Sequence, residues 1–144
     1  MNKINWNFNN SYFALAESFR ENIDPVPVKK PELVIVNKNL ATELNLDLSN
    51  ISEKDLSEVF SGNSLPDGSN SIAQAYAGHQ FGHFTMLGDG RAVLIGEHIT
   101  KSKKKYDIQF KGSGKTVFSR NGDGRAALGP MLREYIISEA MSSL

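Results

Sequence analysis

Tyr106-Asp107-Ile108-Gln109-Phe110-Lys111 is the stretch that decides the fold, because its apolar side chains alternate with polar ones. An alternation with a period of two is typical of a β-strand with one apolar face. Phe110 then lies on the apolar face, and Lys111 points to the opposite face at the end of the strand. A single lysine on a strand is usually a solvated surface residue, so its role depends on what surrounds it.

Downstream of this strand, Gly129-Pro130 begins a predicted helix, because proline suits the first turn of a helix. Glu134 lies off the centre of the apolar face of this helix, where it can reach across to a neighbouring strand. The sequence has no helix stop signal before Leu144. We therefore expect the sequence to be part of a longer one.

Upstream of the strand, Asp89-Gly90 stands between two apolar runs, at 84–87 and 92–95. This pattern is a strong hairpin signal and predicts a hairpin over 84–97. Two interpretations stay open. The glycines either make only a tight turn, or they let a phosphate approach the backbone while Arg91 supplies a guanidinium fork to its oxygens.

The order of these three features is that of a protein-kinase N-lobe, which has a glycine-rich hairpin, a strand lysine and a helix glutamate. A carboxylate such as Glu134 would hold the flexible Lys111 in one orientation beside phosphates. The usual kinase glycine-loop and Val-Ala-Ile-Lys phrases are missing. We predict an α+β fold, with an antiparallel sheet and helices, that resembles a kinase N-lobe with an N-terminal extension.

The extension is predicted to cover residues 1–70, with a packing role, and the nucleotide-binding lobe to cover 71–144. Within the extension we expect a short helix that Ser11 caps, a short strand at 33–36 and a helix that carries Leu40, Ala41 and Leu44. A further helix is expected to begin with a capping box at Ser52 and to end at Gly62.

Composition excludes several classes of function. The 144 residues contain 16 basic and 16 acidic side chains, so the formal net charge is zero and neither nucleic acid nor an anionic membrane is an expected partner. No apolar run is long enough to span a membrane, and no signal peptide is visible. Cysteine is absent, which is compatible with the cytoplasm, the location we expect.

Two motifs resemble known sites but do not match them. Residues 112–116, Gly-Ser-Gly-Lys-Thr, look like the end of a phosphate-binding P-loop, but the glycine required six residues before the lysine is Gln109. His79 and His83 have the spacing of zinc ligands on a helix, but nearby glycines weaken a helix there. We therefore expect neither a P-loop nor a metal site in this chain.

Several longer phrases resemble the selenoprotein O family of pseudokinase-like enzymes. They are Tyr-Ala-Gly-His-Gln-Phe-Gly (76–82), Leu-Gly-Asp-Gly-Arg-Ala (87–92), Asp-Ile-Gln-Phe-Lys-Gly (107–112), Ser-Arg-Asn-Gly-Asp-Gly-Arg-Ala (119–126), Arg-Glu-Tyr (133–135) and Ser-Glu-Ala-Met (138–141). The resemblance is dense from about residue 76 to 141, and looser around Asn10-Ser11-Tyr12. It implies an enzyme that transfers AMP from ATP to protein hydroxyl groups.

The resemblance also implies roles for individual residues. The residues implied to bind the nucleotide are Gly88, Gly90, Arg91, Lys111, Asp123 and Gly124. In this family the lysine contacts the phosphates of an ATP that is flipped relative to true kinases, and Glu134 is its ion-pair partner. The catalytic Asp and the ligands of Mg²⁺ (or Mn²⁺) belong to a C-lobe that this chain lacks, so none is assigned here.

We therefore expect the ATP-binding N-terminal part of a protein adenylyltransferase that acts on Ser, Thr or Tyr hydroxyls, with ATP and acceptor proteins as partners. The chain by itself is expected to be inactive. The alternative is a non-catalytic nucleotide-binding or structural module.

Overall fold

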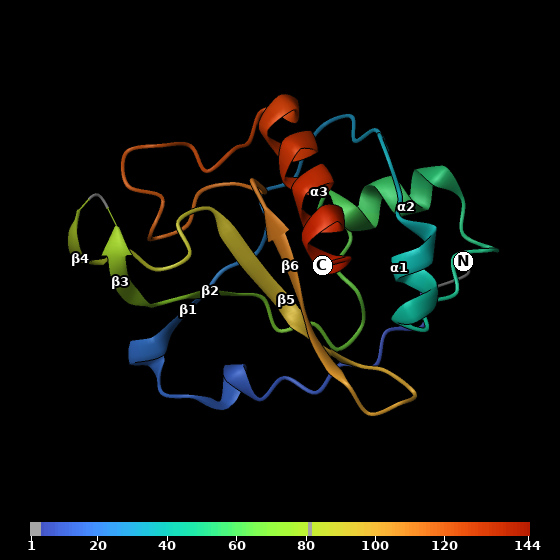
Figure 1. Cartoon of the computed structure of the whole chain (residues 1–144), viewed down its shortest axis with the longest axis horizontal. Helices are drawn as coiled ribbons and strands as arrows, with labels where there is room; N and C mark the ends of the chain where they lie inside the picture. Colours follow the sequence, from blue (N-terminus) through green and yellow to red (C-terminus); the bar gives the residue numbers. More distant parts are fainter. Residues whose placement is uncertain (1–3, 81) are drawn as a thin grey trace.

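The computed structural model describes residues 4–80 and 82–144 and shows an α+β fold, as predicted (Figure 1). Four antiparallel strands form the main sheet in the order β1-β2-β5-β6, and β3 and β4 form a separate two-stranded ribbon. The strands are β1 (Arg20–Asn22), β2 (Ile72–Gln74), β3 (Ala77–Gln80), β4 (His83–Met86), β5 (Ala92–Ile99) and β6 (Lys105–Lys111). The helices are α1 (Lys38–Glu43), α2 (Glu53–Phe60) and α3 (Leu128–Ser142), with short 3-10 turns at Tyr12–Ala14 and Glu17–Phe19. This architecture is consistent with a kinase-like N-lobe.

The β5 strand forms the centre of the core. Seven of its eight residues are buried, and Val93 and Ile95 pack with Phe110 of β6. A register shift between Leu94 and Gly96 interrupts the pairing of β5 with β6, as a β-bulge does. The predicted strand therefore exists with the expected faces, since Phe110 is buried and Lys111 is exposed.

The N-terminal half packs around a second apolar cluster, which α1 and α2 share. The predicted N-cap of α2 is confirmed, because the Ser52 hydroxyl accepts a hydrogen bond from the Asp55 backbone N–H at 3.1 Å. Asp55 does not complete the usual box; its carboxylate accepts the Ser52 hydroxyl at 2.8 Å instead. Gly62 has a φ of +84°, which confirms it as the residue that ends the helix.

Two predictions for the extension are wrong. Residues 33–36 form no strand, and Val34 and Ile35 are more than half exposed, so the apolar run does not find a strand to pair with. The helix expected after Ser11 is replaced by the two 3-10 turns, and the Ser11 side chain makes no cap there. Its hydroxyl instead donates to the Glu97 carboxylate at 2.7 Å.

The predicted hairpin over 84–97 is also wrong. The strand at 83–86 pairs with Ala77–Gln80, whereas β5 pairs with β2 and β6. Asp89 explains the difference, because its backbone N–H donates to the Gln74 carbonyl at 2.9 Å and its carboxylate accepts the Gln74 N–H at 3.1 Å. These bonds close a long excursion between β2 and β5, and β3 and β4 form a hairpin within it.

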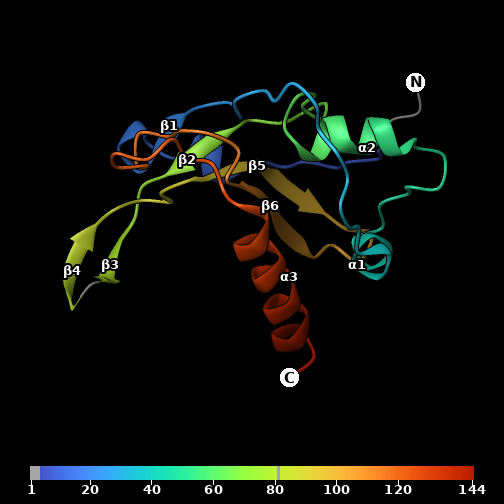
Figure 2. The same cartoon turned by 90° about the horizontal axis from the view of Figure 1, so that it is seen from above.

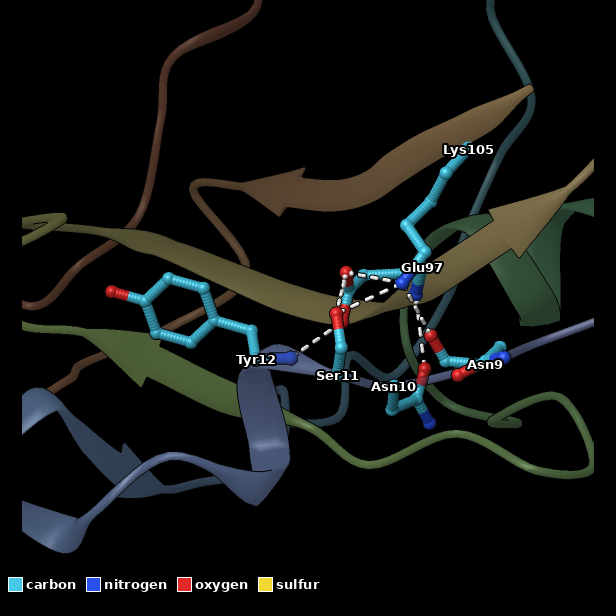
Figure 3. A network of polar contacts seen from close by, with 6 residues as sticks. All are labelled: Asn9, Asn10, Ser11, Tyr12, Glu97 and Lys105. Atoms are coloured by element: carbon cyan, nitrogen blue, oxygen red, sulfur yellow. Dashed lines mark hydrogen bonds and ion pairs between the residues drawn. The ribbon is translucent and has the colours of Figure 1, made fainter.

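A polar network fastens the N-terminal segment to β5 (Figure 3). The Glu97 carboxylate, whose side chain is 8% exposed, accepts hydrogen bonds from the Tyr12 backbone N–H at 2.6 Å, the Ser11 hydroxyl at 2.7 Å and the Lys105 ammonium at 3.0 Å. Burial raises the pKa of Glu97, but these bonds and the charge of Lys105 together outweigh it and hold the pKa below its ordinary value. The network therefore stabilises the fold through an ionised carboxylate.

The α3 helix and the β3–β4 hairpin both extend to the same side of the main sheet (Figure 2). Helix α3 begins at Leu128, so Pro130 lies in its first turn as predicted. None of its residues is buried, and Ile136 and Met141 are 63% and 65% exposed. In the part of the chain that the structure describes, no helix is long and apolar enough to cross a membrane.

Candidate functional site

A cavity of about 560 Å³ lies where two glycine-rich loops meet at the end of β6. The first loop (residues 87–91) joins β4 to β5, and the second loop (residues 118–125) lies between β6 and α3. The cavity lining includes every residue that the sequence implied for nucleotide binding: Gly88, Gly90, Arg91, Lys111, Asp123 and Gly124. The fold therefore brings together residues that are up to 36 positions apart in the sequence, from 88 to 124.

The Lys111–Glu134 ion pair stands beside this cavity. The Lys111 ammonium lies 2.8 and 2.7 Å from the two carboxylate oxygens of Glu134. The two side chains are 46% and 50% exposed, so solvent screens their attraction and the pair adds little to stability. The carboxylate contacts the end of a long, flexible lysine that lines the cavity.

The first loop depends on two left-handed glycines, Gly88 with φ of +57° and Gly90 with φ of +66°. A Cβ on Gly88 would lie 2.4 Å from the ring of Phe118, so the ring packs directly on the Gly88 backbone. A Cβ on Gly90 would meet no atom within 4 Å, and Gly90 is among the residues that line the cavity. Asp89 between them turns away toward Gln74, and partial burial raises the pKa of its carboxyl group although the Gln74 N–H opposes the shift.

The second loop is packed even more tightly. Gly124 has φ of +71°, and a Cβ there would lie 1.9 Å from the Gly114 carbonyl oxygen. Asp123 accepts the Arg125 backbone N–H at 2.9 Å, which shapes the turn while its exposed side chain lines the cavity. Only glycine fits at position 124 without displacing the neighbouring backbone.

Hydrogen bonds connect the first loop to the second loop and to Thr116, which lies just before the second loop. The Gly90 carbonyl accepts the hydroxyls of Thr116 at 2.5 Å and Ser119 at 2.8 Å. The Arg91 guanidinium donates to the Arg125 carbonyl at 2.9 Å. Because each loop holds the other, the cavity walls are set before any ligand enters, which favours binding.

The charge of the cavity lining differs from that of the whole chain. Among the described residues that line it, four are basic (Arg91, Lys111, Arg120 and Arg125) and two are acidic (Asp89 and Asp123). The chain as a whole has a net charge of zero. Positive charge is thus concentrated at the cavity, where it attracts a polyanionic ligand.

Sequence reasoning missed Thr116 and Ser119 as the residues that connect the loops, and Phe118 as a wall of the cavity. In the sequence, Thr116 belongs to the P-loop-like phrase at 112–116, and Ser119 begins the phrase at 119–126 that resembles the selenoprotein O family. The only sequence pattern that marks Thr116 and Ser119 is a hydroxyl-rich segment close to a glycine-rich one. This pattern is too common in proteins to predict a contact between two loops. The contact itself depends on how the two loops cross in space.

The structure shows where the P-loop-like phrase and the His79–His83 pair lie. No helix follows residues 112–116, and Lys115 is exposed, away from the cavity lining formed by the described residues. His79 lies on β3 and His83 on β4, and the His79 ring meets Phe84 edge-on at 5.9 Å. Across residues 4–80 and 82–144, no three potential metal-ligating side chains cluster together.

A larger hollow of about 800 Å³ lies on the other side of Lys111, between α1, β6 and α3. Its lining is mostly aliphatic and aromatic, with residues such as Leu33, Leu40, Ile108 and Tyr135. An anion needs several converging donors. The smaller cavity between the loops has them, and it is therefore the candidate site.

Comparison with known proteins identifies relatives along almost the whole chain. A family model described as "Protein adenylyltransferase SelO" matches residues 2–144. A "Protein nucleotidyltransferase YdiU" of Pelagibacter ubique is 72% identical over 141 residues, which are 98% of this chain and 29% of that protein. Proteins with the same name from Nitrosococcus oceani and Bacillus thuringiensis are 63% and 59% identical. The chain spans about 29% of the length of these relatives.

Proposed function

Because the chain belongs to the SelO family of protein adenylyltransferases, we propose that it forms the ATP-binding part of an enzyme that transfers AMP to protein hydroxyl groups. The relatives carry the name of nucleotidyltransferases, and this chain corresponds to about 29% of their length. The lobe itself is proposed to span residues 71–144, with residues 1–70 as an extension that packs against it.

The observation that carries the proposal is the Lys111–Glu134 pair beside a basic cavity between two connected glycine loops. We assign Lys111 and Arg91 to the phosphates of ATP, since both are cations with N–H donors at the cavity. Gly88 and Gly90 allow the backbone of the first loop to approach the nucleotide closely. Asp123 and Gly124 contact it from the second loop, and Glu134 orients Lys111.

In the proposed reaction, an oxygen of an acceptor Ser, Thr or Tyr hydroxyl attacks the α-phosphorus of ATP. The bond between the α-phosphorus and the bridging oxygen breaks, pyrophosphate leaves, and the hydroxyl proton passes to a base. This chain's share of the reaction is to hold the triphosphate and to offset its charge, which are the main sources of rate in such transfers.

Mg²⁺ or Mn²⁺ would supply further charge neutralisation at the phosphates. The described residues contain no cluster of three His, Cys, Asp or Glu side chains. The ligands of this ion, like the catalytic base, are expected in the C-lobe that the family resemblance implies. The cytoplasmic location expected from the sequence stays a prediction.

The alternative is a nucleotide-binding or structural module without catalysis. The enzyme part and the nucleotide-binding module both require that the chain binds ATP. Titration of ATP into the chain in a calorimeter tests this requirement. We expect binding, and no heat at millimolar ATP would refute it. Incubation of the chain with labelled ATP, Mg²⁺ and an acceptor protein tests whether the chain transfers AMP by itself. We expect no labelling of the acceptor, and labelling by this chain alone would contradict the proposal that catalysis needs the C-lobe.

A further inference from the structure

The phrase Gly-Asp-Gly-Arg occurs twice in the chain, but its two arginines make different contacts. Arg91 of the first copy reaches across to the second loop, where it donates to the Arg125 carbonyl. Arg125 of the second copy turns away from the first loop. Its Nη2 donates to the backbone carbonyls of Val26 at 3.0 Å and Pro27 at 3.3 Å, almost a hundred positions earlier in the chain.

The segment that receives Arg125, residues 25–28, is itself firmly held, and we call it the tether segment. The Asn63 side chain binds both backbone groups of Val28, accepting its N–H at 2.8 Å and donating to its carbonyl at 2.9 Å. Pro25 is buried, and a Cβ on Gly62 would lie 2.3 Å from the Pro25 Cβ. The tether segment is therefore fixed to the end of α2 at both of its ends.

The tether segment also packs closely on residues 113–114, which lie between β6 and the second loop. The Val26 backbone N–H donates to the Ser113 carbonyl at 2.8 Å, and a Cβ on Gly114 would lie 2.4 Å from the Val26 side chain. Gly114 in turn leaves no room for a Cβ on Gly124. Val26 therefore contacts Gly114, and Gly114 contacts Gly124, so we expect a shift of the tether segment to reach Gly124 at the cavity wall.

We propose that Arg125 is a positioning residue, through which the N-terminal extension sets the affinity of the cavity for a nucleoside triphosphate. This inference rests on the proposed function. Its physical basis is that a guanidinium can bridge two neighbouring carbonyls, which fixes the second loop in one place. The backbone carbonyl of Arg125 also holds Arg91, so the position of one arginine is passed on to the other.

The first test is Arg125→Lys, which keeps the positive charge but carries its nitrogen closer to the main chain than the Nη2 atom that donates to both Val26 and Pro27. We expect the Kd for ATP to rise about tenfold, equivalent to about 1.4 kcal/mol. Exchange of the backbone amides in residues 119–125 should become faster. Lys115→Ala, which removes an exposed cation outside the cavity lining of the described residues, is the control and should change neither quantity.

The second test is Asn63→Ala, because Asn63 lies outside the part of the cavity lining that the described residues form. It should release Val28 and weaken ATP binding several-fold, whereas Asn39→Ala, at an exposed position of α1, should not. Thermal melts show which variants are folded at the assay temperature, and a variant that is unfolded there is replaced by Asn63→Ser in the same comparison.

The outcomes separate the two claims. If the unchanged chain binds ATP and both Arg125→Lys and Asn63→Ala bind it equally well, this inference is refuted while the proposed function stands. If the unchanged chain does not bind ATP, the proposed function is refuted, and the inference is refuted with it. A loss of affinity in both variants, with faster amide exchange in the second loop, supports the inference.

Discussion

Replacing Lys111 with alanine should separate ligand binding from stability. The ion pair with Glu134 is about half exposed on both sides, and pairs of this kind contribute at most about 1 kcal/mol to stability. In a chain of this size that amount shifts the melting temperature by about 2–4 °C. We therefore expect Lys111→Ala to melt within about 4 °C of the unchanged chain.

The same substitution should have a large effect on ATP. A hydrogen bond to a charged group is worth about 1.5–3 kcal/mol, so losing the Lys111 ammonium should raise the Kd about 10- to 150-fold. Glu134→Gln leaves the ammonium in place but removes its charged partner, and it should raise the Kd by a smaller factor. Glu139→Gln, an exposed carboxylate further along α3, is the matched control.

Calorimetric titration with ATP and thermal melts of the four proteins measure both quantities. ATP affinity in Lys111→Ala equal to that of the unchanged chain would refute the assignment of this lysine to the phosphates. A fall of more than about 10 °C in its melting temperature would refute the claim that the pair is a weak contributor to stability.

Two further predictions concern the network at Glu97 and the second loop. Glu97→Gln should lower the free energy of unfolding by about 2 kcal/mol at pH 7, since it removes the charge that three donors share, and should leave ATP affinity unchanged. Because folding lowers the pKa of Glu97, the network stabilises the fold above the ordinary value of 4.5 and loses this effect as the pH falls through the folded-state pKa. Urea unfolding should therefore show the gap between variant and unchanged chain narrowing as the pH falls below 4.5, and a gap that stays constant would contradict the reasoning. Gly124→Ala should cost about 1–3 kcal/mol and remove ATP binding, because its Cβ would lie 1.9 Å from the Gly114 carbonyl. Gly122→Ala, whose nearest neighbour would be at 3.4 Å, is its control, and equal behaviour of the two variants would show that the packing at Gly124 does not matter.

The parts of the fold that the sequence predicted correctly are those in which local pattern and burial agree. The alternation in β6, the proline in the first turn of α3 and the cap at Ser52 each follow from a local rule, and the structure confirms all three. The Lys111–Glu134 pair was predicted from the order of elements, and its geometry is confirmed. Its role toward a nucleotide stays a proposal.

The wrong predictions share a physical cause, which is that strand pairing depends on distant partners. The apolar run at 33–36 has strand propensity but pairs with no strand, and the Asp89-Gly90 turn does not join two paired strands. In the second case Asp89 forms hydrogen bonds with the backbone of Gln74, the last residue of β2. Nothing in the residues around position 89 reveals that partner. The tether between Arg125 and Val26 was missed for the same reason, since the two residues are far apart in the sequence.

The central claim is that the cavity between the two glycine loops holds a triphosphate against Lys111. The most direct measurement is a crystal structure of this chain with a non-hydrolysable ATP analogue. The account predicts phosphate oxygens within hydrogen-bond distance of the Lys111 ammonium, between residues 87–91 and 118–125. A nucleotide bound instead in the apolar hollow between α1, β6 and α3, with the cavity between the loops empty, would contradict it.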